Sequence, residues 1–136
     1  MKNLAADPWV DKASASLTEQ DRVALYRLAP VRNYRKAENI LPGKDRSDSF
    51  FEVVEGSIRV FGVTDLPFGT PLHFSKGDII SPIAPKPGVT FWIQALEPAI
   101  VTEITPRVLA SMPERLHIWI YKNALRSYDQ STRSLR

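Results

Sequence analysis

The chain has 136 residues, of which 43% are hydrophobic and 24% are charged, which are the proportions of a domain that buries its own core. No apolar run approaches the roughly 20 residues of a membrane-spanning helix, and the N-terminus shows no signal-peptide pattern, so we expect a cytoplasmic protein. The absence of cysteine excludes disulfides and thiolate metal sites, and the net charge is a modest +3.

The N-terminal part of the chain predicts an arm followed by a short helix. Residues 1–16 lack sustained periodicity, and we expect a flexible arm in front of a single domain over residues 17–136. Thr18 suits an N-cap because its hydroxyl can accept from the free N–H groups of the next turn, which begins with acidic residues. Pro30 cannot continue a helix, so the helix is expected to end before it.

From Val31 onwards the pattern changes to short β-prone runs separated by glycine and proline turns. The runs cover residues 31–35, 40–41, 50–54, 57–63, 70–75, 79–80, 89–96 and 99–105. Residues 42–43 (PG) and 76–78 (KGD) are expected to be turns. In the run 57–63, Ile58 and Val60 share one face, and Arg59 and Phe61 share the other. This spacing predicts a mainly β jelly roll, or double-stranded β-helix, of about eight antiparallel strands with flanking helices.

The C-terminal part predicts a short helix over residues 107–112 and a long one over about 114–133. The apolar side chains of the long helix spread over an arc wider than the ~100° stripe that one face of a monomer needs. Four of them also follow heptad-like spacing: Ile118, Tyr121, Leu125 and Tyr128. We expect this helix to pack on its own sheet and on a second copy of the chain. A helix wrapped deeply into its own domain is the alternative.

Several motifs resemble those of cyclic nucleotide-binding domains, the sensor modules of catabolite-activator-type regulators. Residues 35–43 (RKAENILPG) resemble the family's Lys-Gly-Glu-x-Ile opening, and residues 51–60 (FEVVEGSIRV) resemble its Tyr-x-Val-x-x-Gly-x-Val-x-Val hairpin. Residues 76–80 (KGDII) are similar to the Gly-Asp motif before its phosphate-binding cassette, and residues 90–95 resemble the next strand. The likeness covers residues 17–130 in the right order, so it implies the jelly roll of that family.

The resemblance stops where the family binds its ligand. There the family has a glutamate that accepts from the ribose 2′-hydroxyl and an arginine that neutralises the cyclic phosphate. At these positions this chain has Ser81-Pro82 and Val89-Thr90, which carry no charge. Losing a buried guanidinium–phosphate pair costs about 3–5 kcal/mol, so we expect no binding of cAMP or cGMP in the usual manner. Ala37 replaces the family's usual glycine, and we expect a negative φ there.

Three functions follow from these observations. The first is a non-enzymatic regulatory or interaction module, a homodimer that senses another small molecule or acts through a protein partner. Its expected ligand-binding residues are Ser81, Ile83, Ala84, Lys86 and Thr90. The second is a cyclic nucleotide-binding protein in signal transduction or transcription, in which Lys86, or an arginine from the second copy, replaces the missing arginine. The third is a cupin-like metal enzyme, but His73 and His117 are fewer ligands than such a site needs.

The remaining expectations concern chemistry and nucleic acid. No nucleophile elbow, P-loop or Rossmann motif occurs, so we expect no catalytic residues, no cofactor and no metal. The segment from Arg107 to Arg136 is basic, which suits nucleic acid, an acidic partner or simply a solvated helix face. The sequence stops at Arg136, before the point where relatives often carry a DNA-binding helix-turn-helix, so we expect no direct DNA binding. Trp92 is expected in the core or the pocket wall rather than on a stacking platform.

Overall fold

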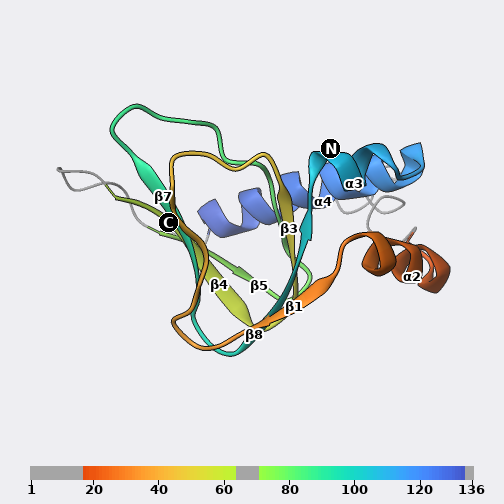
Figure 1. Ribbon diagram of the computed structural model, residues 1–136, viewed down its shortest axis with the longest axis horizontal. Coiled ribbons are helices and arrows are strands. Elements are labelled where there is room, and N and C mark those ends of the chain that lie inside the picture. Colours follow the sequence, from red (N-terminus) through yellow and green to blue (C-terminus); the bar gives the residue numbers. More distant parts are fainter. Residues whose placement is uncertain (1–16, 64–70, 134–136) are drawn as a thin grey trace, which may run out of the picture.

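The computed structural model describes residues 17–63 and 71–133. In this part of the chain, helix α2 (Glu19–Leu28) is followed by the strands and then by helices α3 (Pro106–Ala110) and α4 (Glu114–Arg133) (Figure 1). The strands are β1 (Val31–Tyr34), β2 (Asn39–Lys44), β3 (Phe50–Glu55), β4 (Ser57–Val63), β5 (Leu72–Ser75), β6 (Ile79–Ile80), β7 (Thr90–Ala95) and β8 (Ala99–Ile104). The predicted jelly roll with flanking helices is confirmed. The predicted arm, residues 1–16, lies outside the described residues.

The described strands form two antiparallel sheets of four strands each. Sheet A has the order β1-β8-β3-β6, and sheet B has the order β2-β7-β4-β5. Apolar side chains from the facing sides of both sheets meet between them. This roll core consists of Leu41, Phe51, Val53, Ile58, Phe74, Ile80, Ile93, Ala95, Ala99 and Val101. As the alternation in residues 57–63 predicted, Ile58 is buried in this core.

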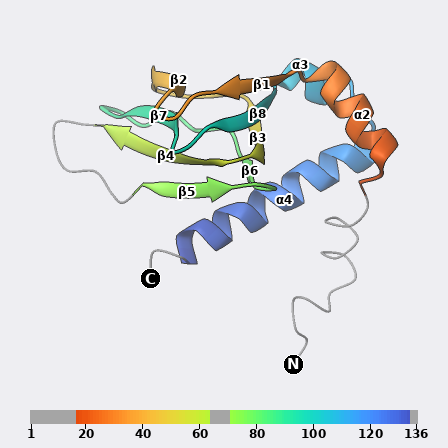
Figure 2. The same ribbon diagram turned by 90° about the horizontal axis from the view of Figure 1, so that it is seen from below.

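The outer face of sheet A is covered by helices. Because strand side chains alternate, Phe51 and Val53 enter the roll core, whereas Phe50 and Glu52 point toward the helices. A second buried cluster, here called the helix layer, joins the three helices to this face. It consists of Leu25, Ala29, Phe50, Ile79, Ile104, Met112, Leu116, Trp119, Ile120 and Ala124. Figure 2 shows the result, with α2 and α3 beside sheet A and α4 running diagonally past β6 and β5.

Helix α2 begins with the expected N-cap. The Thr18 hydroxyl accepts from the Asp21 N–H at 3.1 Å, and the Asp21 carboxylate accepts from the Thr18 N–H at 3.3 Å. This capping box satisfies two of the N–H groups that a helix start leaves without partners. The helix ends at Leu28, two residues before Pro30, as expected.

The segment predicted as a Pro42-Gly43 turn lies inside β2, so that prediction is wrong. The pairing of β2 with β7 shifts register twice, and Gly43 has a φ of +56°. A bulged edge strand accommodates a proline and a left-handed glycine that a regular strand would reject. A Cβ at Gly43 would also lie 2.7 Å from Cζ2 of Trp92, so the glycine makes room for the indole ring.

Ala37 has a φ of +71°, contrary to the expected negative value. Hydrogen bonds on both sides hold this conformation: the Ala37 N–H donates to the Ala95 carbonyl at 2.8 Å, and the Ala95 N–H donates to the Glu38 carbonyl at 2.9 Å. The Ala37 carbonyl also accepts from the Gln94 side chain at 3.0 Å. The left-handed region costs a residue with a Cβ roughly 1–2 kcal/mol, which these contacts offset.

Candidate functional site

A cavity of about 200 Å³ lies between β6, the loop that follows it, sheet B and α4. We call it the roll pocket. Its lining residues are Val60, Leu72, Phe74, Ile79, Ile80, Ser81, Pro82, Ile83, Phe91, Ala124 and Tyr128. None of them is an aspartate, glutamate, lysine, arginine or histidine, and the polar side chains are the hydroxyls of Ser81 and Tyr128. The pocket therefore offers apolar contact and two neutral hydrogen-bonding groups.

Two of the five predicted site residues line this pocket, namely Ser81 and Ile83. Ala84, Lys86 and Thr90 are exposed and lie outside its lining, so their role in binding stays a prediction. Val89, at the position of the family's arginine, is buried, whereas Pro82, at the glutamate position, lines the pocket.

The loop from Ser81 to Val89 lacks the run of free N–H groups that a phosphate nest uses. Proline occupies positions 82, 85 and 87 and donates nothing. The Ile83 N–H donates to the Ser47 carbonyl at 2.9 Å, and the Val89 N–H donates to the Lys86 carbonyl at 3.1 Å. No two successive residues of this loop therefore both present an unengaged N–H.

The strand before the loop is tied directly to α4. The Ile79 N–H donates to the Ser127 hydroxyl at 2.9 Å in a buried contact, and this hydroxyl in turn donates to the Asn123 carbonyl at 2.7 Å. The Ser131 hydroxyl donates to the His73 carbonyl of β5 at 2.9 Å. These residues were not predicted from the sequence, although small polar side chains at four-residue spacing on one helix face were a visible signal.

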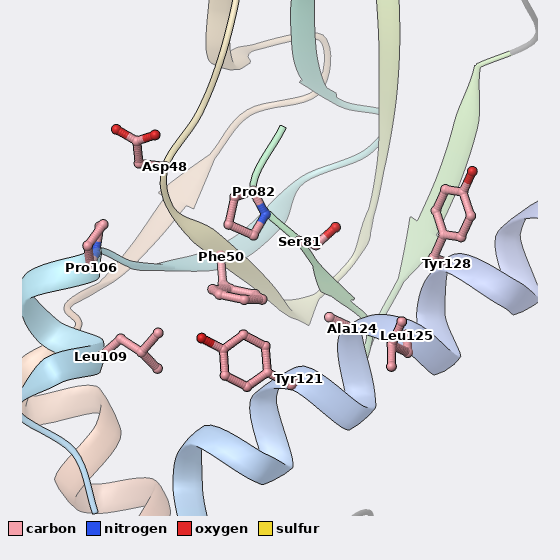
Figure 3. A pocket seen from close by; sticks show the side chains of 10 residues that line it. All are labelled: Asp48, Phe50, Ser81, Pro82, Pro106, Leu109, Tyr121, Ala124, Leu125 and Tyr128. Atoms are coloured by element: carbon pink, nitrogen blue, oxygen red, sulfur yellow. The ribbon is translucent and has the colours of Figure 1, made fainter. Parts of the chain in front are cut away.

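A larger cavity of about 670 Å³ lies between α3, α4 and the start of the loop (Figure 3). We call it the helix groove. It is lined by Asp48, Phe50, Ser81, Pro82, Pro106, Leu109, Tyr121, Ala124, Leu125 and Tyr128. Tyr121 meets Phe50 edge to face, with ring centroids 5.3 Å apart at 78°. Tyr128 lines both this groove and the roll pocket, so the two cavities share one wall of α4.

The four residues predicted for a dimer interface form an exposed stripe on α4. Their exposed fractions are 39% for Ile118, 49% for Tyr121, 69% for Leu125 and 55% for Tyr128. On the adjoining face of the helix, Leu116, Ile120 and Ala124 are buried in the helix layer. Packing on the chain's own sheet thus uses one half of the predicted apolar arc and leaves the other half in solvent.

A buried carboxylate joins α2 to sheet A. Glu52 of β3 is 3% exposed and accepts from the Tyr26 hydroxyl at 2.9 Å, while Arg22 approaches it at 3.9 Å. Burial raises the pKa of Glu52, against the hydrogen bond from Tyr26 and the charge of Arg22. Burial and the neighbouring carboxylate raise the pKa of Tyr26 to about 12. The contact lies apart from both cavities and serves to hold α2 in place.

A second carboxylate joins α2 to α4. Asp21 pairs with Arg115, whose hydrogen bond holds the pKa of Asp21 below its usual value. The pairing places one end of α2 against the start of α4.

The two histidines do not form a metal site. His73 lies on β5, and His117 contacts the Leu109 carbonyl from the start of α4. Among the described residues, no group of three or more histidine, aspartate or glutamate side chains converges. Within the same residues, every helix is too short or too polar to cross a membrane.

Trp92 is half-buried and lies outside both buried clusters, so the expected core position is wrong. It also lies outside the linings of the roll pocket and of the helix groove. It pairs with Phe61 across β7 and β4, on the face of sheet B that points away from the roll core. The alternation of residues 57–63 put Phe61 on this face, but the register that brings Trp92 opposite Phe61 was not visible in the sequence.

No protein-family model and no curated protein matches the sequence. Solved structures do match. Oxidized CprK in complex with o-chlorophenolacetic acid is 19% identical with a TM-score of 0.66, covering 87% of this chain and 50% of CprK. A CooA mutant from Carboxydothermus hydrogenoformans is 16% identical with a TM-score of 0.60, covering 98% of this chain and 83% of the other.

The catabolite activator protein of Thermus thermophilus is 15% identical with a TM-score of 0.58, covering 90% of this chain and 62% of that protein. The chain spans about half the length of the CprK structures it matches. At these identities the likeness concerns the fold. The chain has the β-roll fold of the catabolite activator protein, which confirms the fold that the sequence motifs implied.

Proposed function

We propose that this chain is a non-enzymatic sensing module of a regulatory system. It binds a small, largely apolar molecule in the roll pocket and pairs with a second copy through the exposed stripe of α4. The observation that carries the proposal is the lining of the roll pocket, which is apolar and contains no charged side chain. The cytoplasmic location expected from the sequence stays a prediction.

The pocket argues against a cyclic nucleotide held in the usual manner. Its volume of about 200 Å³ is below the roughly 300–1,000 Å³ typical of ligand sites. An anion placed there would lose its water without gaining a guanidinium or a nest of N–H groups, a loss worth several kcal/mol. A neutral molecule with one or two hydrogen-bonding groups suits the hydroxyls of Ser81 and Tyr128 better.

The structural relatives support a ligand other than a nucleotide on this fold. CprK was solved in complex with o-chlorophenolacetic acid, a small aromatic acid. The analogy concerns the size and the aromatic ring and not the carboxylate, and on that basis we assign a small neutral aromatic or apolar ligand to the roll pocket of this chain.

The link between ligand and dimer would run through α4. Ser127 holds the strand that leads into the pocket, and Tyr128, the next residue, lines the pocket and belongs to the exposed stripe. A ligand that moves β6 would therefore act on the helix that carries the dimer contact. Each large apolar side chain of the stripe contributes roughly 1.5–3 kcal/mol if a partner buries it fully.

Calorimetry of the purified chain tests the ligand. We expect no heat of binding from cAMP, cGMP or cyclic dinucleotides, and native mass spectrometry is expected to detect any co-purified small apolar molecule. Micromolar binding of a cyclic nucleotide that Lys86→Ala abolishes and Lys44→Ala preserves would overturn the proposal. That result would establish the second function, in which Lys86 replaces the missing arginine.

Sedimentation analysis tests the dimer. We expect a dimer for the natural chain and a monomer for Leu125→Glu, with the unfolding transition of the monomer retained. The matched control is Leu28→Glu, because Leu28 is exposed on α2 and outside the stripe. A monomeric natural chain, or dissociation by the control alone, would refute the dimer proposed here.

A further inference from the structure

The outer face of sheet B carries a layer of aromatic and cationic side chains. Phe61 and Trp92 face each other across β4 and β7, with ring centroids 6.5 Å apart and ring planes within 13° of parallel. The guanidinium carbon of Arg59 lies 4.4 Å from the centroid of the Phe61 ring. All three side chains are half-buried and reach solvent. We call these three residues the aromatic layer.

This layer is held in a fixed arrangement. Nε and Nη2 of Arg59 donate to the Gln94 side-chain oxygen at 3.0 and 2.7 Å. The Gln94 amide donates to the Ala37 carbonyl at 3.0 Å, and Gly43 leaves room for the Trp92 ring. A ligand that stacks on such a surface finds the rings and the guanidinium already placed, so little side-chain entropy is lost on binding.

The strands of sheet B carry basic but no acidic side chains. The strands β2, β4, β5 and β7 contain no aspartate or glutamate, and Arg59 and His73 lie opposite each other on the outer face in the pairing of β4 with β5. The turn that accepts from Gln94 adds Arg35 and Lys36. In the turns beside β7, the Glu38 carboxylate accepts from the Arg35 N–H and the Glu97 carboxylate accepts from the Ser57 hydroxyl. Sheet A differs, because β3 carries Glu52 and Glu55.

We propose that this face of sheet B binds single-stranded nucleic acid, with bases stacked on the aromatic layer and phosphates near Arg59 and the Arg35–Lys36 turn. The partner must present both flat π-faces and negative charge, and single strands offer the two together with every nucleotide. Antiparallel sheets with exposed aromatic residues use the same physics to bind single-stranded RNA. The proposal does not depend on the roll pocket or on the dimer.

Double-stranded nucleic acid does not suit this surface. In a duplex the bases are stacked on one another, and their faces are not free to pack on a protein ring. A four-stranded sheet face is also too broad to enter the major groove, which admits a helix or a two-stranded ribbon. Duplex binding would therefore use phosphate contacts alone and be weaker.

Fluorescence anisotropy with labelled oligonucleotides of about 12 nucleotides tests the proposal. The probes are oligo(U), oligo(dT) and a duplex of equal length, each titrated with the full chain at low and at physiological salt. We expect both single strands to bind more tightly than the duplex. Trp92→Leu and Phe61→Leu keep apolar bulk but remove a π-face, and each is expected to weaken binding about tenfold or more.

Arg59→Gln is expected to weaken binding and to reduce its salt dependence. The matched charge control is Arg27→Gln, at an exposed arginine of α2. This control is expected to bind within about twofold of the natural chain. Thermal melting identifies any variant that fails to fold. If Trp92→Leu fails to fold, Phe61→Leu and Arg59→Gln still test the proposal.

Three results would overturn the proposal. The first is the absence of binding at low salt. The second is binding that the substitutions in the aromatic layer leave unchanged, which would indicate diffuse attraction to a basic protein. The third is a duplex that binds as tightly as the single strands.

Discussion

Sheet A and sheet B shield their outer faces by different means. Sheet A is covered by three helices, and the contact includes a buried carboxylate and ten apolar residues of the helix layer. Sheet B is shielded by its own side chains, which contact one another in the aromatic layer and in the Arg59–Gln94 hydrogen bonds. Substitutions on sheet A should therefore change the stability of the fold, whereas those on the outer face of sheet B should mainly change what that face can bind.

The largest effect is expected in the helix layer. Ile120 is fully buried there, so Ile120→Ala removes three methyl or methylene groups and leaves a cavity. We expect the free energy of unfolding to fall by about 2–5 kcal/mol, measured by urea denaturation. The control is Val63→Ala at an exposed position of sheet B, which should change stability by less than about 0.5 kcal/mol. Equal losses in the two variants would contradict the comparison.

The next effect concerns the buried carboxylate of sheet A. Tyr26→Phe removes the hydroxyl that donates to Glu52 and leaves a buried acceptor without this partner. Hydrogen bonds to charged groups contribute about 1.5–3 kcal/mol, and we expect a loss of that size in urea denaturation. Tyr121→Phe is the matched control, because the Tyr121 hydroxyl lies on the exposed stripe. If both variants lose the same stability, Glu52 does not rely on Tyr26.

The pH dependence of stability tests Glu52 separately. Its pKa is raised above 4.5 in the folded chain, so the folded state holds the proton more tightly than the unfolded state does. The stabilising contribution of Glu52 is then full below pH 4.5 and is lost as the pH rises through the raised pKa. We expect Glu52→Gln to remove this loss, because its side chain stays neutral. Parallel profiles for the natural chain and Glu52→Gln would show that burial does not govern this carboxylate.

Asp21 of α2 is expected to give the opposite dependence of stability on pH. Its pKa is lowered from 3.8 by the hydrogen bond with Arg115, so its contribution is lost as the pH falls below that value. Asp21→Asn should therefore flatten the acid limb of the profile and leave the limb above pH 4.5 unchanged.

On sheet B the sharpest test is Gly43, which lies beneath Trp92. Gly43→Ala meets both a left-handed φ and the indole ring, and we expect a loss of about 1–3 kcal/mol together with a shift in tryptophan emission. Gly88→Ala is the matched control, since Gly88 also has a positive φ but no atom lies within 4 Å of its added Cβ. Gly88→Ala should lose less stability than Gly43→Ala and leave the tryptophan emission unchanged. Equal losses of stability in Gly43→Ala and Gly88→Ala would mean that the Trp92 ring moves aside at no cost in free energy.

The sequence allowed most elements to be predicted, because their signals are local. The N-cap Thr18, the alternation in Ser57–Val63 and the turn at Gly77 each depend on neighbours in the chain. The errors depend on distant partners. The Pro42-Gly43 pair is a bulge rather than a turn because β7 sets the register of β2, and Trp92 faces outward because β4 pairs with it in that register.

The candidate site was predicted in part for the same reason. Ser81 and Ile83 follow directly from the position of the cassette, and the pocket includes both. The contact between Ile79 and Ser127 joins residues 48 positions apart, and no local pattern assigns it. Whether Lys86 and Thr90 contact a ligand stays a prediction.

The smallest effect has the opposite sign. Ala37 is the only non-glycine residue with a positive φ in the described part of the chain, so Ala37→Gly should relieve backbone strain of roughly 1–2 kcal/mol. The added freedom of glycine in the unfolded chain costs about 0.4–1 kcal/mol, so we expect a net gain of about 0.5–1 kcal/mol. Ala84→Gly, at an exposed loop position with an ordinary φ, should instead lose about 0.4–1 kcal/mol. A gain in stability at both positions would point to a general effect of glycine. A gain at Ala37 alone shows that the hydrogen bonds from β7 impose the strained turn beside the aromatic layer.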